Sequence, residues 1–388
     1  MRNVTEASWR SRAALFAACL ILQDSPPSGP ADGGRPTTFD GTESATLRDA
    51  VGGFVITAEP LGGLVRHDLA AGATTTIREA KPGQPIVHAL SGPDRDGRLL
   101  VVLSESPAAS LALLPMEGGA AQVIARGQDG AGFKFTFAAP ALSPTGRHAL
   151  VVRDPRSLHM EVEPKTTFHE GRVELFDLAT GKPLALSMSG LAGSAAWFPD
   201  GASFCISALI SPAELPKGAI ETYHEKAHGT KSSVVPLADR RVPVLFRVEV
   251  ASGKKELLQI GRRCVVSSDG KSLLVQGIGT EWMKRDVASG AIAGIRWPGA
   301  FHGADHPERR LATYPGGPIA FLDDDLVVYW GLPTAGAAVG TTKNDSPQVG
   351  EKPLLTIKVA RLSTGEFVTL IPSIDPRRNL TFGRTPAR

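Results

Sequence analysis

The stretch Gly171–Met188, GRVELFDLATGKPLALSM, has the pattern of a strand, a tight turn and a returning strand. Its first half, Arg172–Leu178, carries the β-branched and aromatic side chains that pack well in a sheet. The turn falls on Asp177–Lys182, where Asp and Thr can cap backbone groups and Gly181 tolerates a positive φ. The sequence therefore predicts a β-hairpin here.

Variants of this hairpin recur along the whole chain. Copies of its turn lie at His67–Gly72, Val248–Lys254, Arg285–Gly290 and Ala360–Glu366, with a degenerate copy at Pro115–Gly119. A second turn, of the S-P-x-G type, precedes most copies, at Pro93–Arg98, Ala141–Arg147, Trp197–Gly201, Val266–Lys271 and Ala304–Arg309. Two hairpins per unit give four strands, which we call A to D in chain order. An all-β unit of four antiparallel strands repeating every ~40 residues predicts the blades of a β-propeller.

The spacing of the turn glycines predicts the number of blades. Most intervals approach one repeat once obvious insertions are removed, but the interval from Gly290 to Gly365 is much longer. Gly317–Asp325 resembles a C strand with its turn, and a turn at Asp325 divides the long interval into two blades. This division favours seven blades, and six is the alternative.

Composition narrows the classes of function. The chain has 388 residues with 42 Gly, 30 Pro and a net charge of +3, which favours many turns and offers no electrostatic footprint for nucleic acid. Three cysteines are too few for a disulfide framework, and we expect Cys205 and Cys264 to be buried thiols. The tryptophans of the predicted strands, Trp197, Trp282, Trp297 and Trp330, are expected to pack between blades.

The N-terminal segment predicts export. Arg2, Arg10 and Arg12 precede the apolar run Ala13–Leu22, as in a secretory leader, and the run is too short to span a bilayer. Lipid attachment at Cys19 is one alternative, giving a membrane anchor, and a disordered leader on a cytoplasmic protein is another. We divide the chain into a leader (1–22), a linker (23–46), the propeller (47–376) and a basic tail (377–388), which could supply a closing strand.

The repeats also show a family resemblance. The S-P-x-G and D-L-A-T-G hairpins resemble those of TolB-like and WD-repeat-like β-propellers, over roughly residues 50–372. Arg240–Lys255 is also similar to the propeller domain of the prolyl oligopeptidase family. The chain lacks the G-x-S-x-G nucleophile elbow of that family's hydrolase domain, so the resemblance does not imply peptidase activity.

Two insertions indicate where function resides. Residues 155–170 and 211–241 each follow a B strand, so both project from the same face of the disc on adjacent blades. Loops on a rigid scaffold are common binding sites. We therefore predict a non-catalytic surface for a protein or small-ligand partner on this face, and a scaffold subunit of a larger complex is an alternative. The candidate binding residues are His159, His169, Glu170, Tyr223, His224 and His228.

One motif has catalytic form. In His224-Glu225-Lys226-Ala227-His228, two imidazoles one helical turn apart could bind zinc, with Glu225 as general base of a metal-dependent hydrolase. Neighbouring Pro and Gly residues leave room for only a short helix, and no third ligand is marked by spacing, so we treat this as an alternative. Asp323–Asp325 could hold calcium, but a solvated hairpin turn is the favoured interpretation.

Overall fold

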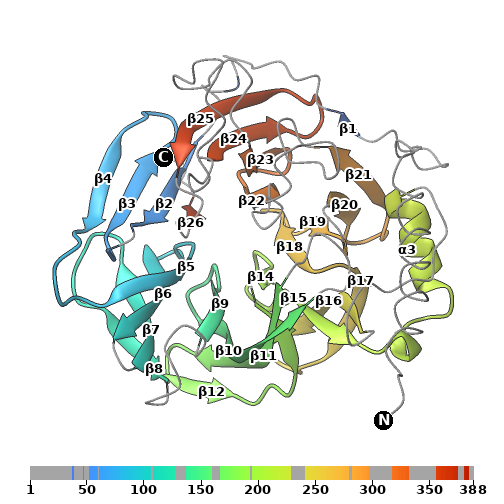
Figure 1. The fold of residues 1–388 in the computed structure, drawn as a ribbon, viewed down its shortest axis with the longest axis horizontal. Coiled ribbons are helices and arrows are strands. Elements are labelled where there is room, and N and C mark those ends of the chain that lie inside the picture. The colour runs from blue at the N-terminus through green and yellow to red at the C-terminus, as the bar shows by residue number, and fades with distance from the viewer. Residues whose placement is uncertain are drawn as a thin grey trace, which may run out of the picture.

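Strands of the computed structural model form six sheets arranged around a common axis (Figure 1). The described residues are 37–38, 47, 52–59, 61–105, 108–127, 137–159, 167–192, 195–228, 241–278, 282–296, 317–331, 355–374 and 380–383. The sheets are the blades of a β-propeller, which we number 1 to 6, and in each blade the A strand lies nearest the axis (Figure 1).

Each blade contains four antiparallel strands, A to D from the axis to the rim. Blade 1 comprises β26 (Leu380–Gly383), β2 (Phe54–Ala58), β3 (Leu64–Asp68) and β4 (Thr74–Arg78). Blade 2 comprises β5 (Ile86–Ser91), β6 (Arg98–Glu105), β7 (Ala108–Pro115) and β8 (Gln122–Arg126). Blade 3 comprises β9 (Phe137–Leu142), β10 (His148–His159), β11 (Thr167–Asp177) and β12 (Lys182–Leu184), and β13 (Ser189–Leu191) also pairs with β11.

Blade 4 comprises β14 (Ala196–Trp197), β15 (Ser203–Ile210), β16 (Val242–Glu249) and β17 (Lys255–Ile260). Blade 5 comprises β18 (Arg263–Val266), β19 (Ser272–Gln276), β20 (Trp282–Asp286) and β21 (Ile292–Arg296), with β1 (Thr37–Thr38) added in parallel to β21. Blade 6 comprises β22 (Gly317–Phe321), β23 (Leu326–Gly331), β24 (Leu355–Arg361) and β25 (Phe367–Ile374). Helical segments η3 (Pro212–Glu214) and α3 (Ala219–His228) lie between β15 and β16.

The ring is closed by a strand from the far end of the chain. β26 pairs antiparallel with β2, with Phe54 opposite Gly383 and Thr57 opposite Leu380. It supplies the innermost strand of the blade whose other three strands come from the start of the propeller. Because blade 1 combines strands from both ends of the propeller sequence, the hydrogen bonds between β26 and β2 hold the ring closed.

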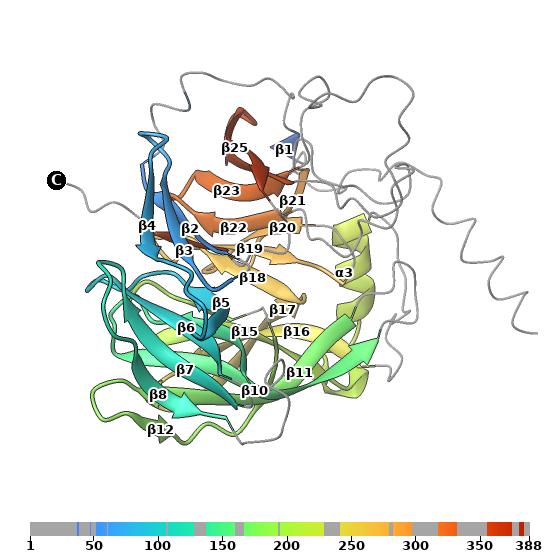
Figure 2. The same ribbon diagram turned by 60° about the vertical axis from the view of Figure 1, so that its left-hand side comes forward.

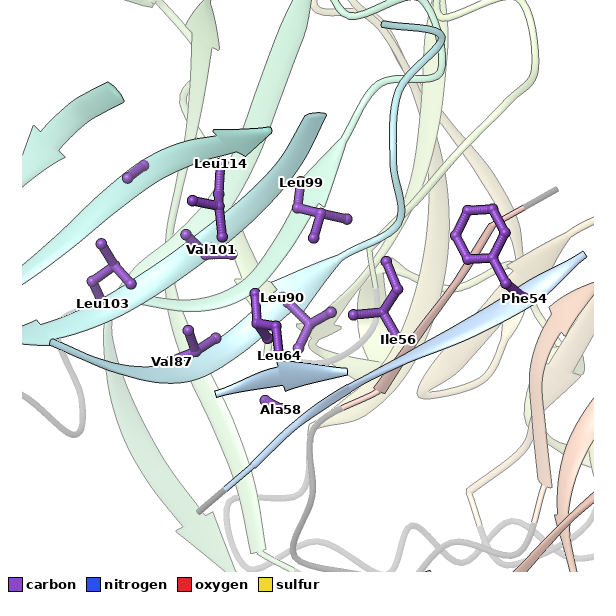
Figure 3. Packing of buried hydrophobic residues seen from close by; sticks show 11 residues of the cluster. Phe54, Ile56, Ala58, Leu64, Val87, Leu90, Leu99, Val101, Leu103 and Leu114 are labelled. Atoms are coloured by element: carbon purple, nitrogen blue, oxygen red, sulfur yellow. The ribbon is translucent and has the colours of Figure 1, made fainter. Parts of the chain in front are cut away.

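Both faces of most strands are apolar because each blade is covered on two sides. In β6, Leu99, Val101 and Leu103 pack toward blade 1, whereas Leu100 and Val102 pack toward blade 3. Figure 3 shows the first of these interfaces, where residues of β2 and β3 meet those of β5 and β6. The continuous apolar run of β6 is therefore explained by burial on both sides, since consecutive side chains point to opposite faces.

The predicted hairpin turn of the opening stretch is confirmed. In Asp177–Lys182, Asp177 Oδ1 accepts hydrogen bonds from the N–H groups of Ala179 and Thr180 at 2.9 and 3.0 Å, and Gly181 has φ +66°. The hydrogen bond from the Thr180 backbone is the main cause that lowers the pKa of Asp177. This turn joins β11 to β12, so Gly171–Met188 contains a C–D hairpin whose turn lies on the face opposite the two insertions.

The favoured count of seven blades is wrong, and the alternative of six is the one observed. Gly317–Phe321 is the A strand of blade 6 and not a C strand. It forms a hairpin with β23 across the turn at Asp323–Asp325, and β23 pairs on its other side with β24, which pairs with β25. Asp323 Oδ1 caps this A–B turn, accepting from the N–H groups of Asp325 and Leu326 at 2.7 and 2.6 Å. An aspartate-capped turn after an apolar strand looks alike in either hairpin, so the sequence interval alone could not distinguish them. The additional A–B turn proposed at Ala304–Arg309 lies outside the described residues.

Other side chains occupy the positions expected for them. Trp197 packs between blades 3 and 4 and donates from Nε1 to the carbonyl of Ala141 at 2.9 Å, and Trp282 packs between blades 5 and 6. Cys205 and Cys264 are buried free thiols. Trp297 and the side chain of Trp330 lie outside the described part of the chain. Within that described part, no helix combines the length and the apolar character that crossing a membrane requires.

Candidate functional site

The two insertions project from blades 3 and 4, on the face of the propeller that carries the B–C connections. In blade 3 the insertion continues the B–C hairpin, and a β-bulge between Arg153 and Arg156 separates it from the blade. Asp154 in the bulge has φ +48°, a conformation that costs energy for a residue with a side chain. A side chain on Gly171, opposite the bulge, would collide with the carbonyl of Arg153. We call residues 156–159 and 167–170, beyond the bulge, the hairpin extension.

An ion pair joins the hairpin extension to the insertion of blade 4. Arg241, directly before β16, donates to both carboxylate oxygens of Glu170 at 2.9 Å. Arg156, from the other strand of the extension, donates to Glu170 Oε2 at 3.0 Å. The Glu170 side chain is only 5% exposed, and two-point contacts between arginine and carboxylate fix orientation as well as distance. The two insertions are therefore held together and not merely adjacent.

The outer part of the extension is accessible. The Arg156 side chain is 70% exposed although one of its nitrogens contacts Glu170. The exposed Ser157 Oγ lies 3.3 Å from Nδ1 of His169, across the two strands of the extension. The backbone of His159 pairs with Thr167 at the end of β10, and its side chain is not described. The accessible surface is thus a polar, basic ribbon that can offer hydrogen bonds to a partner.

Helix α3 packs against the side of blade 5. Tyr223 is buried, and its hydroxyl accepts a hydrogen bond of 2.6 Å from the N–H of Ile278, which follows β19. Leu215 and Ile220 pack against the same apolar cluster, which includes Val244 of blade 4. Figures 1 and 2 both place α3 at the rim beside β21, and Figure 2 shows it on the side toward which β11 extends. The insertion of blade 4 thus bridges blades 4 and 5.

The candidate zinc motif lies in this helix, which is longer than the short helix expected. All ten residues Ala219–His228 are helical, so His224 and His228 are one turn apart in the backbone. His224 is half-buried with its ring edge-on to Tyr223, at 5.2 Å between centroids, whereas Glu225 is exposed. The side chain of His228 is not described. Among the described residues no group of three or more His, Cys, Asp or Glu could hold a metal ion. Zinc on His224 and His228 stays a prediction.

The acidic turn Asp323–Asp325 is occupied by protein donors. Besides the cap made by Asp323, the carboxylate of Asp324 accepts from the Ser268 hydroxyl at 2.9 Å, and Asp325 accepts from the Ser363 N–H at 2.7 Å. These contacts join the turn to blade 5 and to the C–D turn of its own blade. They support the interpretation of this turn as a structural hairpin end.

Sequence reasoning chose Glu170 but overlooked its partners. Arg156 and Arg241 lie inside the predicted insertions and were not singled out, because a charged residue in a loop is usually solvated. The signal available was that Arg241 directly precedes the apolar strand VPVLFRVE, where a charge close to the core needs a partner. Identifying that partner required the structure, because 71 residues separate the pair in sequence.

Comparison with known proteins supports the fold. No family model and no curated protein matches the chain. Among solved structures, TolB from Acinetobacter baumannii aligns at 14% identity with a TM-score of 0.52, covering 85% of this chain and 66% of TolB. A nidogen/laminin complex aligns at 12% identity (TM-score 0.49; 85% and 98% covered), and a putative TolB from Agrobacterium tumefaciens at 13% (0.45; 87% and 99%). The chain thus spans just under two thirds of the Acinetobacter protein and has the fold of a TolB-like β-propeller.

Proposed function

We propose that this protein is an exported, non-catalytic propeller that binds a protein or small-ligand partner on the face carrying its insertions. The observation that carries the proposal is the pairing of Glu170 with Arg241, which holds two insertions from adjacent blades in one fixed arrangement. Loops that only drift on a surface do not need a buried charge to hold them together. A preorganised surface reduces the entropy lost when a partner binds.

The chemistry of this surface suggests the character of the partner. Arg156 and Arg172 are 70% and 63% exposed, and both lie on the hairpin that begins with β10 and ends with β11. Their ion pairs with Glu170 and Glu174 leave the outer parts of the guanidinium groups accessible. Guanidinium groups favour carboxylates, so we expect an acidic surface or ligand to bind here. Export is proposed from the basic and apolar pattern of residues 1–22.

Site-specific photo-cross-linking in the source organism tests the binding face. A photoreactive residue replaces Ser157 on the hairpin extension in one variant, and Thr180 in the opposite C–D turn in the matched control. We expect a discrete adduct from position 157 and none from position 180. Adducts from position 180 alone would refute the proposal for the insertion face. Protein recovered from the cytosol with residues 1–22 intact would refute export.

The alternative function, a metal-dependent hydrolase, is tested by the zinc content of the purified protein. A metal-dependent enzyme using α3 must bind zinc stoichiometrically in the purified protein and lose it in His224→Ala. We expect no such zinc, and elemental analysis of the wild-type and variant proteins measures it directly. Stoichiometric zinc that disappears in the variant would contradict the non-catalytic proposal.

A further inference from the structure

A row of polar side chains crosses blade 5 at the end of its strands that faces away from the A–B turns. Arg263 in β18 pairs with Gln276 in β19, which in turn pairs with Trp282 in β20. Directly paired residues of antiparallel strands project from the same side of a sheet, with Cβ atoms about 5 Å apart. Trp282 belongs to the buried apolar cluster that includes Phe321 and Tyr329 of blade 6, so this row faces blade 6.

Two members of the row have buried polar atoms without hydrogen-bond partners. Gln276 is 2% exposed and Trp282 is 3% exposed. Neither Oε1 of Gln276 nor Nε1 of Trp282 is hydrogen-bonded to any protein atom. A buried donor or acceptor left unpaired destabilises a fold, so two neighbouring ones call for an explanation.

The third member, Arg263, forms no ion pair with a described carboxylate. Arg263 opens β18, the strand of blade 5 nearest the axis (Figure 1), and its side chain is partly exposed. Surrounding protein atoms lower the pKa of Arg263 by desolvation, and the neighbouring Cys264 has a smaller, opposite effect on it. Among the described residues no carboxylate forms an ion pair with Arg263. The neighbouring strand β22 begins with Gly317, which brings no side chain to this place.

We propose that Arg263, Gln276 and Trp282 form a binding site for a small organic carboxylate that carries a hydroxyl group next to its acid group. The planar guanidinium of Arg263 matches a carboxylate, and the indole N–H of Trp282 adds a donor to the same anion. The amide oxygen of Gln276 accepts from the ligand's hydroxyl group. Each unpaired group of the row then has a partner of the correct kind.

The row lies on the same B–C face as the insertions and near α3, but in blade 5, and it contains no residue of the hairpin extension or of α3. Gln276 is two residues before Ile278, whose N–H donates to Tyr223 of α3. The packing of α3 therefore fixes the end of β19 that presents Gln276. Binding of a small anion by the row does not depend on whether the insertion face binds a partner, so the two proposals can fail separately.

Indole NMR spectroscopy of the full protein tests the site. The chain has 5 tryptophans, and the Trp282 signal is assigned from its loss in Trp282→Phe. Titration with glycolate should shift that signal saturably, and acetate, which lacks the hydroxyl group, should bind roughly 3- to 10-fold more weakly. Arg263→Gln should weaken the binding of glycolate at least about tenfold, since hydrogen bonds to charged groups are stronger than those between neutral groups. Gln276→Leu should abolish the preference for glycolate over acetate.

Controls separate the site from general effects. Arg95→Gln removes an exposed arginine from an A–B turn of blade 2 and should leave the titration unchanged. Without ligand, Arg263→Gln should not lower the midpoint of thermal unfolding, because it removes a desolvated charge that pairs with no carboxylate of the described residues. If Arg263→Gln does not fold, Arg263→Lys keeps the charge, loses the planar pair of donors and should also bind more weakly.

Three results would overturn the proposal. The first is a Trp282 signal that does not move with about 100 mM glycolate or acetate, far above a 1 mM Kd worth about 4 kcal/mol. The second is a shift that persists unchanged in Arg263→Gln. The third is tighter binding of inorganic phosphate than of glycolate, which would show that the site binds phosphate and is not selective for a hydroxy carboxylate.

Discussion

Replacing Glu170 by Gln tests whether the two insertions form one unit. The carboxylate is almost fully buried and accepts three hydrogen bonds from two arginines, at 2.9, 2.9 and 3.0 Å. Glutamine has the same shape but no charge, and its NH₂ group faces the guanidinium of Arg241. Removing one partner of a buried pair typically costs about 3–5 kcal/mol.

The structure lowers that figure somewhat. The Arg241 side chain is 25% exposed, so water can partly solvate the guanidinium after the pair is lost. We therefore expect a loss of about 2–3 kcal/mol, just below the range for fully buried pairs. This corresponds to roughly a 30- to 150-fold increase in the equilibrium for opening of the insertions, because 1.4 kcal/mol is tenfold.

Amide hydrogen exchange resolves where the loss occurs. Exchange should accelerate by that factor in 167–173 and in the first residues of β16, while the core strand β6 should be unchanged. Arg156→Gln is the matched control, because its side chain is 70% exposed and exposed pairs contribute about 0–1 kcal/mol. Equal, small effects of both substitutions would refute the idea that Glu170 holds the insertions together.

Three further predictions concern the rest of the fold. Tyr223→Phe leaves the N–H of Ile278 buried and unpaired, so α3 should lose about 1–3 kcal/mol, seen as faster hydrogen exchange in 219–225; unchanged exchange would contradict this role. Burial raises the pKa of Cys205 above its usual 9.0, and the hydrogen bond with Cys264 adds to this effect. At pH 8 the Cys205 thiol of the native protein should therefore not react with a thiol reagent. Its folded thiol keeps a proton that the unfolded thiol loses, so unfolding free energy should fall as the pH rises above about 9; rapid native labelling would disprove the burial of this thiol. Deleting 377–388 removes β26 and exposes the edge of blade 1, so the variant should not fold as a monomer; an unchanged unfolding midpoint would show that closure does not need this strand.

Local structure could be predicted from the sequence because its causes are local. Asp177, Thr180 and Gly181 make a turn wherever the chain brings them together, and the alternation of turns with apolar runs then implies four-stranded blades. The B–C position of both insertions also followed, since strand order fixes the face from which each loop leaves. These inferences need no knowledge of contacts between distant residues.

The number of blades and the site contacts depend on distant residues, so sequence reasoning missed them. Asp323 caps its turn in the same manner whether the turn joins A to B or C to D, and the pairing of β23 with β24, and of β24 with β25, settles the choice. Arg241 and Arg263 are two arginines at strand starts, yet one has a buried carboxylate and the other has none among the described residues. That difference comes from neighbouring blades and has no local signature.

The most direct test of the central claim is hydrogen exchange of the protein in complex with the partner captured by cross-linking. We predict slower exchange in the hairpin extension and in α3, with the C–D turns Asp177–Lys182 and Glu249–Lys254 unchanged. Slower exchange confined to those turns, with the hairpin extension and α3 unaffected, would show that the partner binds the opposite face and would refute the proposed binding surface.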